Sequence, residues 1–101
     1  MADMTIEAKK FEDFEPHVGT VFSIVAEGLP PLDLTLEEAK PLKQNSETLR
    51  PPFQLLFRRN DEEILPQGLY QFRHDAMGDL VIFLVPSGKD SSGVEYCATF
   101  N

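Results

Sequence analysis

Hydrophobic and polar residues alternate along most of this chain with a period of two, the pattern of a strand that buries one face. The clearest case is the segment 32–37, in which Leu32, Leu34 and Leu36 alternate with polar residues. The same period predicts six short strands, at residues 18–24, 32–37, 53–58, 69–74, 79–86 and 94–100. Because Pro41 limits any helix in the segment 37–40, we interpret that segment as a strand end or a turn.

The connections between the later strands favour antiparallel pairing. Gly78 ends a short connection between the fourth and fifth strands, and the loop 87–93 before the sixth is rich in Gly, Ser and Asp. Both features are hairpin signals, so the last three strands are predicted to form a meander. Closely spaced turns without a strong helical period predict an all-β fold, a small single-domain barrel or sandwich of about six mainly antiparallel strands.

The fifth predicted strand, residues 79–86, is apolar on both faces. Leu80, Ile82 and Leu84 lie on one face, and the intervening residues 81, 83 and 85 are also hydrophobic. Two apolar faces are typical of a strand that is covered on both sides, which lies centrally or lines a closed barrel. We therefore expect this strand to lie at the centre of the fold.

The first fifteen residues are polar and acidic, unlike the segments that follow. Phe11 and Phe14 are three positions apart, which indicates one helical turn within residues 5–14, and Pro16 ends it. The two phenylalanines are expected to anchor residues 1–15 as an arm on a single β-domain, residues 16–101. A polar loop is predicted at residues 43–52, and a charged turn at residues 59–63.

Length, charge and cysteine content narrow the classes of function. The 101 residues fit one domain, and a net charge of −8 opposes binding to nucleic acid or to an anionic membrane. The charge either keeps the protein soluble or favours a basic partner. Cys97 is the only cysteine, so no intramolecular disulfide can form. Because neither a signal peptide nor a membrane-spanning run is visible, we expect a cytoplasmic protein.

His74 and Asp75 are the most suggestive pair for catalysis, since a histidine beside a carboxylate can act as a general base. Adjacent strand residues point to opposite faces, so a structural histidine followed by a turn fits the pattern better. His17 and His74 lack the spacing of metal ligands, and no glycine-rich phosphate loop is present. The sequence therefore assigns no catalytic residue, no metal site and no cofactor.

Four residues are candidates for binding. Arg58 and Arg73 would lie close together on the outer face if the third and fourth strands pair, and could there bind an anion or an acidic partner. Tyr70 and His74 share the other face of the fourth strand. The alternative for the arginines is ion pairing with acidic residues of the turn 59–63.

Several short motifs occur in a fixed order between Phe14 and Asn101. The most specific are Pro66-Gln67-Gly68-x-Tyr70 and the terminal Phe100-Asn101. In this order the motifs resemble a family of small bacterial proteins of unknown function, some of them encoded near phage tail-collar-like or secreted structural proteins. The resemblance implies a compact β-fold with a tail-like or accessory structural role. It implies no activity and no site residues.

Three hypotheses about function remain open. The first is a non-enzymatic interaction or structural module, an accessory of a phage-derived or surface assembly, that binds a protein partner or a second copy of itself. The second is a small-ligand-binding β-barrel with aromatic residues and leucines around a cavity. The third is an enzyme of unknown class that uses His74 and a carboxylate from another strand.

Overall fold

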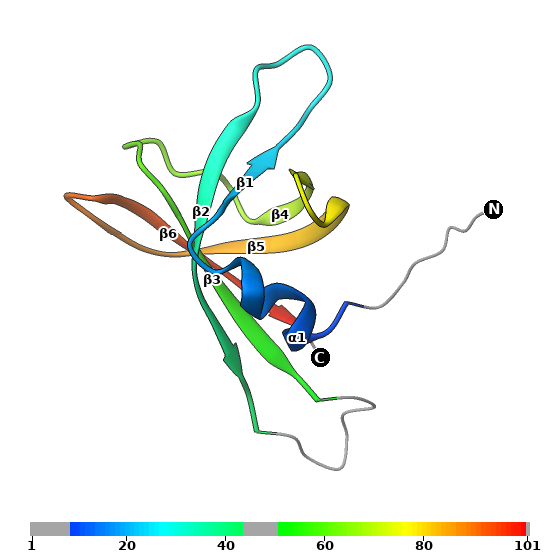
Figure 1. Ribbon diagram of the computed structural model, residues 1–101. Coiled ribbons are helices and arrows are strands. Elements are labelled where there is room, and N and C mark those ends of the chain that lie inside the picture. The colour runs from blue at the N-terminus through cyan, green and yellow to red at the C-terminus, as the bar shows by residue number, and fades with distance from the viewer. Residues whose placement is uncertain (1–8, 44–50, 101) are drawn as a thin grey trace.

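The computed structural model describes residues 9–43 and 51–100. Six strands close into a barrel in the order β1-β2-β3-β6-β5-β4, and all neighbouring strands are antiparallel (Figure 1). The strands are β1 (Val21–Ile24), β2 (Leu32–Pro41), β3 (Phe53–Arg59), β4 (Gly68–His74), β5 (Gly78–Asp90) and β6 (Gly93–Phe100). They follow a helical turn, α1 (Phe11–Phe14), and a 3-10 helix, η1 (Glu15–His17). The predicted all-β fold of about six antiparallel strands is confirmed, and it takes the form of a barrel.

The first two strands differ in extent from the prediction. β1 begins at Val21 rather than at residue 18, because η1 continues to His17 and Gly19 then turns the chain with a φ of +94°. β2 runs on to Pro41 through a register shift between Leu36 and Glu38. A bulge of this kind admits one extra residue without ending the ladder, so the segment 37–40 is strand.

The predicted meander of the last three strands is confirmed, since β5 lies between β4 and β6. The connection between β5 and β6 is shorter than predicted, however. The two strands pair until Asp90 lies opposite Gly93, which leaves only Ser91 and Ser92 in the turn. The predicted loop 87–93 is therefore largely part of the hairpin. Of the predicted loop 43–52, residues 44–50 lie outside the described part of the chain.

One hydrophobic core fills the interior of the barrel. Its members are the inward side chains that the alternation predicted, among them Leu34, Phe57 and Tyr96. Aromatic rings meet across the interior, and the ring centroid of Phe57 lies 5.4 Å from those of both Phe22 and Phe72. These separations are typical of packed aromatic pairs.

The helical turn packs onto the barrel through its phenylalanines. The Phe14 side chain is buried, and its ring centroid lies 5.7 Å from Phe53 and 5.6 Å from Phe100. Phe11 meets Phe53 edge to face at 6.4 Å. Figure 1 accordingly shows α1 beside the C-terminal end of the chain. Each buried phenylalanine contributes about 1.5–3 kcal/mol, which is enough to hold a turn too short to be stable alone.

The expectation that β5 is covered on both faces was wrong. Its inward residues Leu80, Ile82 and Leu84 are buried, but the outward residues Val81 and Phe83 are 67% and 47% exposed. The reason is geometric. A closed barrel has a single interior, so each strand can bury only one face against it. Within residues 9–43 and 51–100, no element covers the outer face of β5.

Gly93 lies where the backbones of two strands approach closely. Its φ is +125°, and a methyl group added there would lie 2.2 Å from the carbonyl oxygen of Arg59 in β3. A carbon atom cannot approach a backbone oxygen so closely, so β6 and β3 would have to separate at this point. Glycine is therefore required for the ladder in which Arg59 pairs with Val94.

We expect Gly93→Ala to lower the free energy of unfolding by about 3 kcal/mol or more, because backbone strain adds to the steric clash. Gly28→Ala is the matched control, since Gly28 has a φ of +79° and open space where the alanine methyl group would lie. The control should cost only about 1–2 kcal/mol for its backbone conformation. Urea unfolding of both variants measures the difference, and equal losses would contradict the close approach.

Candidate functional site

His74 ends β4 with both ring nitrogens hydrogen bonded. Nδ1 accepts from the backbone N–H groups of Ala76 and Met77, at 3.0 and 3.2 Å. Because Nδ1 is an acceptor, the ring proton lies on Nε2, which donates to the Thr20 hydroxyl at 2.9 Å. That hydroxyl in turn donates to the carbonyl oxygen of His17 at 2.6 Å. The ring therefore links the β4–β5 turn to the segment just before β1.

The surroundings of His74 favour its neutral form. Burial lowers its pKa below the ordinary value, the His17 side chain lowers it further, and Asp75 acts in the opposite direction. The ring also packs on Phe22, with centroids 4.2 Å apart, and on His17 at 4.7 Å. A general base needs a nitrogen that can reach a substrate. Both nitrogens of His74 are occupied within the protein, which is the arrangement of a structural histidine.

Arg58 is the centre of an ion-pair cluster on the outer face of the barrel. Its guanidinium lies 3.1 Å from Glu37 of β2, 3.0 Å from Asp90 of β5 and 4.0 Å from Glu95 of β6. It also donates to the Ser92 hydroxyl at 3.0 Å. The hydrogen bond to Glu37 raises the pKa of Arg58; burial acts in the opposite direction, and the charges of the three acidic residues raise the pKa further. The side chain thus links three strands and is not oriented toward an external anion.

The other two candidates are also engaged locally. Arg73 forms an ion pair with Asp79 at 3.1 Å, directly opposite in the β4–β5 ladder. Tyr70 donates its hydroxyl proton to the carbonyl oxygen of Pro66. Burial, with a smaller effect from Tyr96, raises the pKa of Tyr70.

The structure does not gather the four candidate residues into one site. β3 pairs with β2 and β6, whereas β4 pairs with β1 and β5, so the pairing of the third and fourth strands that would have joined Arg58 to Arg73 does not occur. Tyr70 and His74 are four residues apart on β4, a separation of roughly 13 Å along a strand. Arg59, predicted in a charged turn, instead ends β3 as a buried residue paired with Asp61 at 3.3 Å.

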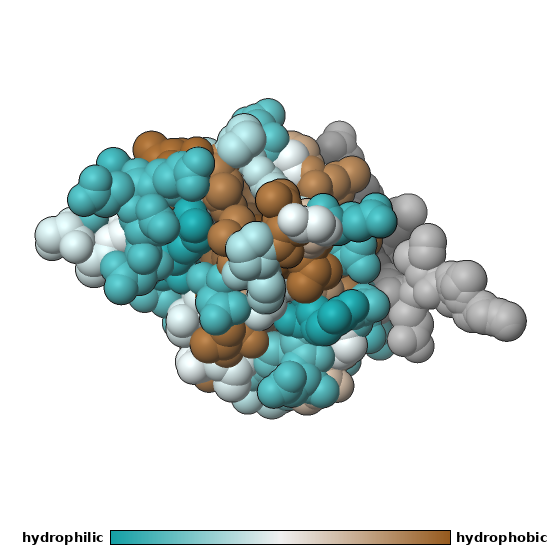
Figure 2. Space-filling model, turned by 90° about the horizontal axis from the view of Figure 1, so that it is seen from above, coloured by the Kyte–Doolittle hydropathy of each residue, from teal (hydrophilic) through white to brown (hydrophobic). Residues whose placement is uncertain are grey.

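The feature that sequence reasoning missed is an apolar stripe on the outer face of β4 and β5. We define the stripe as Leu69, Val81, Phe83 and Val85, which are 71%, 67%, 47% and 38% exposed. Leu69 lies directly opposite Phe83 in the ladder, and Val85 lies opposite Cys97 of β6. Figure 2 shows that hydrophobic side chains reach the molecular surface between hydrophilic ones. The signal in the sequence is the run of hydrophobic residues at 81, 83 and 85, a pattern that predicts burial on both faces and does not distinguish it from exposure.

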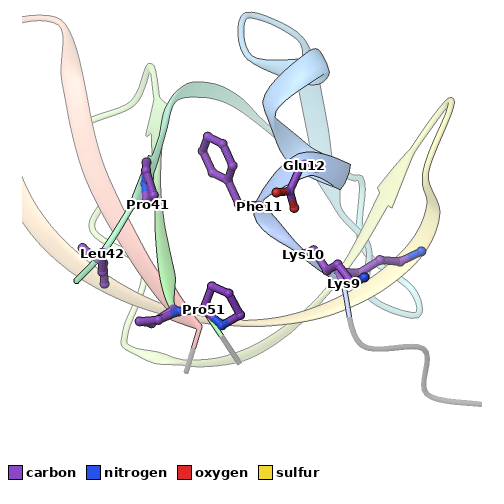
Figure 3. A pocket seen from close by; sticks show the side chains of 8 residues that line it. Lys9, Lys10, Phe11, Glu12, Pro41, Leu42 and Pro51 are labelled. Carbon is purple, nitrogen blue, oxygen red and sulfur yellow. The ribbon is translucent and has the colours of Figure 1, made fainter. Parts of the chain in front are cut away.

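A small hollow lies between α1 and the end of the β2–β3 hairpin at which β2 finishes and β3 begins. Its volume is about 190 Å³, and its apolar wall consists of Phe11, Pro41, Leu42, Pro51 and Pro52. Lys9, Lys10 and Glu12 complete the lining. Figure 3 shows these three charged residues on one side of the hollow and Pro41 and Leu42 on the other, with the Phe11 side chain between them.

Residues 9–43 and 51–100 meet neither the requirements of a metal site nor those of a membrane-spanning helix. No group of three or more His, Cys, Asp or Glu side chains is placed to hold a metal ion there. Over the same residues, no helix has both the length and the apolar character needed to cross a bilayer.

Comparison with known families identifies the domain. A family model described as a domain of unknown function, DUF6916, matches residues 9–100. The chain belongs to this family. No curated protein and no solved structure matches the chain. The resemblance to a family of unknown function is thus confirmed at the level of the family, and the DUF6916 match carries no activity with it.

In this DUF6916 domain, the residues that the sequence suggested for binding are structural, and the accessible apolar surfaces lie elsewhere. His74, Arg58, Arg73 and Tyr70 all have partners within the fold. The apolar stripe and the hollow beside α1 are the two places where, within the described ranges, we find hydrophobic side chains gathered at an accessible surface.

Protonation of His74 should destabilise the fold. Since its folded-state pKa is below that of the unfolded chain, the unfolded state binds more protons near neutrality. The contribution is therefore complete above about pH 6.5 and is lost as the pH falls through the folded-state pKa. Thermal melts between pH 7.5 and 5.5 should show a falling midpoint.

His74→Asn is the informative variant, because the amide oxygen can replace Nδ1 as the acceptor and does not titrate. We expect it to lower stability by about 1–2 kcal/mol at pH 7.5 through the lost bond to Thr20. The pH dependence between 7.5 and 5.5 should become flatter. An unchanged slope in this variant would show that other groups cause it.

Proposed function

We propose that this DUF6916 domain is a non-enzymatic structural module that associates with a second copy of itself through the apolar stripe. The observation that carries the proposal is the placement of Leu69 opposite Phe83, with Val81 and Val85 on the same outer face. The outer face of an antiparallel barrel normally carries polar residues at such positions. Contiguous exposed apolar side chains mark surfaces that another molecule covers.

Charge supports a second copy as the occupant of the stripe. The chain has a net charge of −8, so most faces of one copy repel those of another. The stripe is an exception, because its ionic neighbours Arg73 and Asp79 neutralise each other and Gln71 is uncharged. A neutral apolar face is complementary to itself, which is the requirement of a two-fold symmetric dimer.

The energetics predict a weak dimer. Full burial of a Leu, Val or Phe side chain contributes about 1.5–3 kcal/mol, so two half-exposed stripes contribute on the order of 10 kcal/mol. Association costs about 4–15 kcal/mol in lost freedom of motion. At the lower end of that cost the net gain is about 6 kcal/mol, which corresponds to a dissociation constant on the order of 10–100 μM.

Self-association fits the wider role that the sequence suggests. Repeated weak contacts between identical domains suit an accessory component of a phage-derived or surface assembly, in a bacterial cell. The alternative of a ligand inside the barrel has no supporting observation, because the rings of Phe22, Phe57 and Phe72 pack against one another in the interior. The enzyme hypothesis loses its best candidate, since His74 is bonded at both nitrogens.

Sedimentation velocity from 5 to 500 μM, values chosen to span the expected constant of roughly 10–100 μM, tests the proposal. The unmodified protein should shift from monomer to dimer over this range. Phe83→Thr and Leu69→Thr should each remain monomeric, because threonine keeps the strand preference but removes the apolar contact. Since both side chains are exposed, the thermal midpoint should change little.

Leu29→Thr is the matched control. Leu29 is 68% exposed, close to Leu69, but it lies in the turn between β1 and β2. This variant should dimerise like the unmodified protein. A monomer at 500 μM in the unmodified chain, or equal weakening by Leu29→Thr and Leu69→Thr, would refute the assignment of the stripe.

A further inference from the structure

The basic residues of this acidic protein fall into two classes. Arg58, Arg59 and Arg73 each have a carboxylate within 3.3 Å. Lys10, Lys40, Lys43 and Lys89, in contrast, form no ion pair with any other residue in the described ranges 9–43 and 51–100, and Lys89 lies apart from the other three, in β5. With 17 acidic residues in the chain, this local excess of unpaired positive charge needs an explanation.

Three of these lysines belong to the segments that border the hollow beside α1. Lys10 lines it, and Lys40 and Lys43 flank Pro41 and Leu42 of its wall in the sequence. The hairpin is held closed at this point because the Leu42 N–H donates to the Pro52 carbonyl at 2.9 Å. This bond fixes the apolar wall, and Lys10 lies in the same lining.

The wall of the hollow suits an alkyl chain. Prolines 41, 51 and 52 have no N–H group, so they offer no hydrogen-bond donor to a polar ligand. The volume of about 190 Å³ is somewhat larger than the cavity of about 150 Å³ that is known to hold benzene. The space therefore accommodates an apolar group of roughly six to eight carbon atoms.

We propose that the hollow binds a medium-chain carboxylate, with the alkyl chain against Phe11, Leu42 and the prolines and the carboxylate beside Lys10. Glu12 also lines the hollow and opposes an anion. Lys10 in the lining offsets this charge, and Lys43, next to Leu42 in the sequence, adds positive charge nearby. The site lies on a different part of the barrel from the apolar stripe and does not depend on self-association.

Octanoate is the probe, titrated at pH 7 into the full chain labelled with nitrogen-15 and followed by backbone amide shifts. For about ten non-hydrogen atoms, a saturable dissociation constant on the order of 1 mM is expected. The shifts should concentrate at Phe11, Glu12 and Leu42. Acetate should not bind because it lacks the chain, and 1-octanol should bind more weakly because it lacks the charge.

Two variants test the two parts of the site. Lys10→Glu should weaken octanoate binding by about fivefold or more, since it reverses a charge near the carboxylate. Leu42→Asp should abolish binding by making the wall polar. The matched controls are Lys89→Glu at the β5–β6 hairpin and Leu29→Asp in the β1–β2 turn, and both should bind octanoate normally.

Phe83→Thr separates this proposal from the proposed function, because it should bind octanoate like the unmodified protein even though it does not dimerise. Equal binding by Lys10→Glu and Lys89→Glu would overturn the assignment. Amide chemical-shift changes centred on Leu69 and Phe83 would also overturn the assignment. Binding of an acidic peptide by a protein that does not bind octanoate would overturn it as well. Lys10 is exposed, so its variant remains informative even if Leu42→Asp disturbs the hairpin.

Discussion

The seam between β1 and β4 is the contact on which the rest of the barrel depends. In the part of the chain that the structure describes, only Ser23–Arg73 and Ile24–Phe72 pair across it, with one further hydrogen bond from the Val25 N–H to the Gln71 carbonyl at 2.9 Å. The β3–β6 ladder, by comparison, continues through seven residue pairs. If the seam opened, the sheet would have two free edges and the packed rings of the interior would meet water.

A side-chain hydrogen bond of His74 adds a second link between the two sides of this short seam. Through Thr20 its ring connects the end of β4 to the residues that lead into β1, beyond the last backbone pair. A polar side chain is buried here because each of its nitrogens finds a partner, which offsets the cost of removing it from water. The residue that most resembled a catalytic base in the sequence is therefore one that keeps the barrel closed.

The sequence predicted the inner face of the barrel much better than the outer face. Leu34, Phe57 and Tyr96 each belong to a series of hydrophobic residues at every second position, and burial forces such residues inward wherever the strands lie. The pattern could not predict which strands pair, because the order depends on closure between distant segments. The proximity expected for Arg58 and Arg73 failed for this reason.

The candidate site was predicted only in part. The structural interpretation of His74 agrees with its hydrogen bonds, whereas the hollow beside α1 joins residues 9–12 to residues far along the chain and leaves no local pattern. The stripe was visible as hydrophobic residues at 81, 83 and 85, but alternation alone cannot distinguish a covered face from an exposed one. Only the closed barrel, with its single interior, resolves that ambiguity.

The two apolar faces of β5 also affect what happens before the barrel has formed. Residues 80–85 are six consecutive hydrophobic residues, mostly β-branched or aromatic, without charge, glycine or proline. A segment of this kind can stack into cross-β aggregates when it is exposed in an unfolded chain. Asp79 and Pro86 stand directly at its two ends, where a charge and a residue without an N–H interrupt such stacking. In the folded domain β5 pairs with β4 along one edge and with β6 along the other, so its backbone is not available for such stacking.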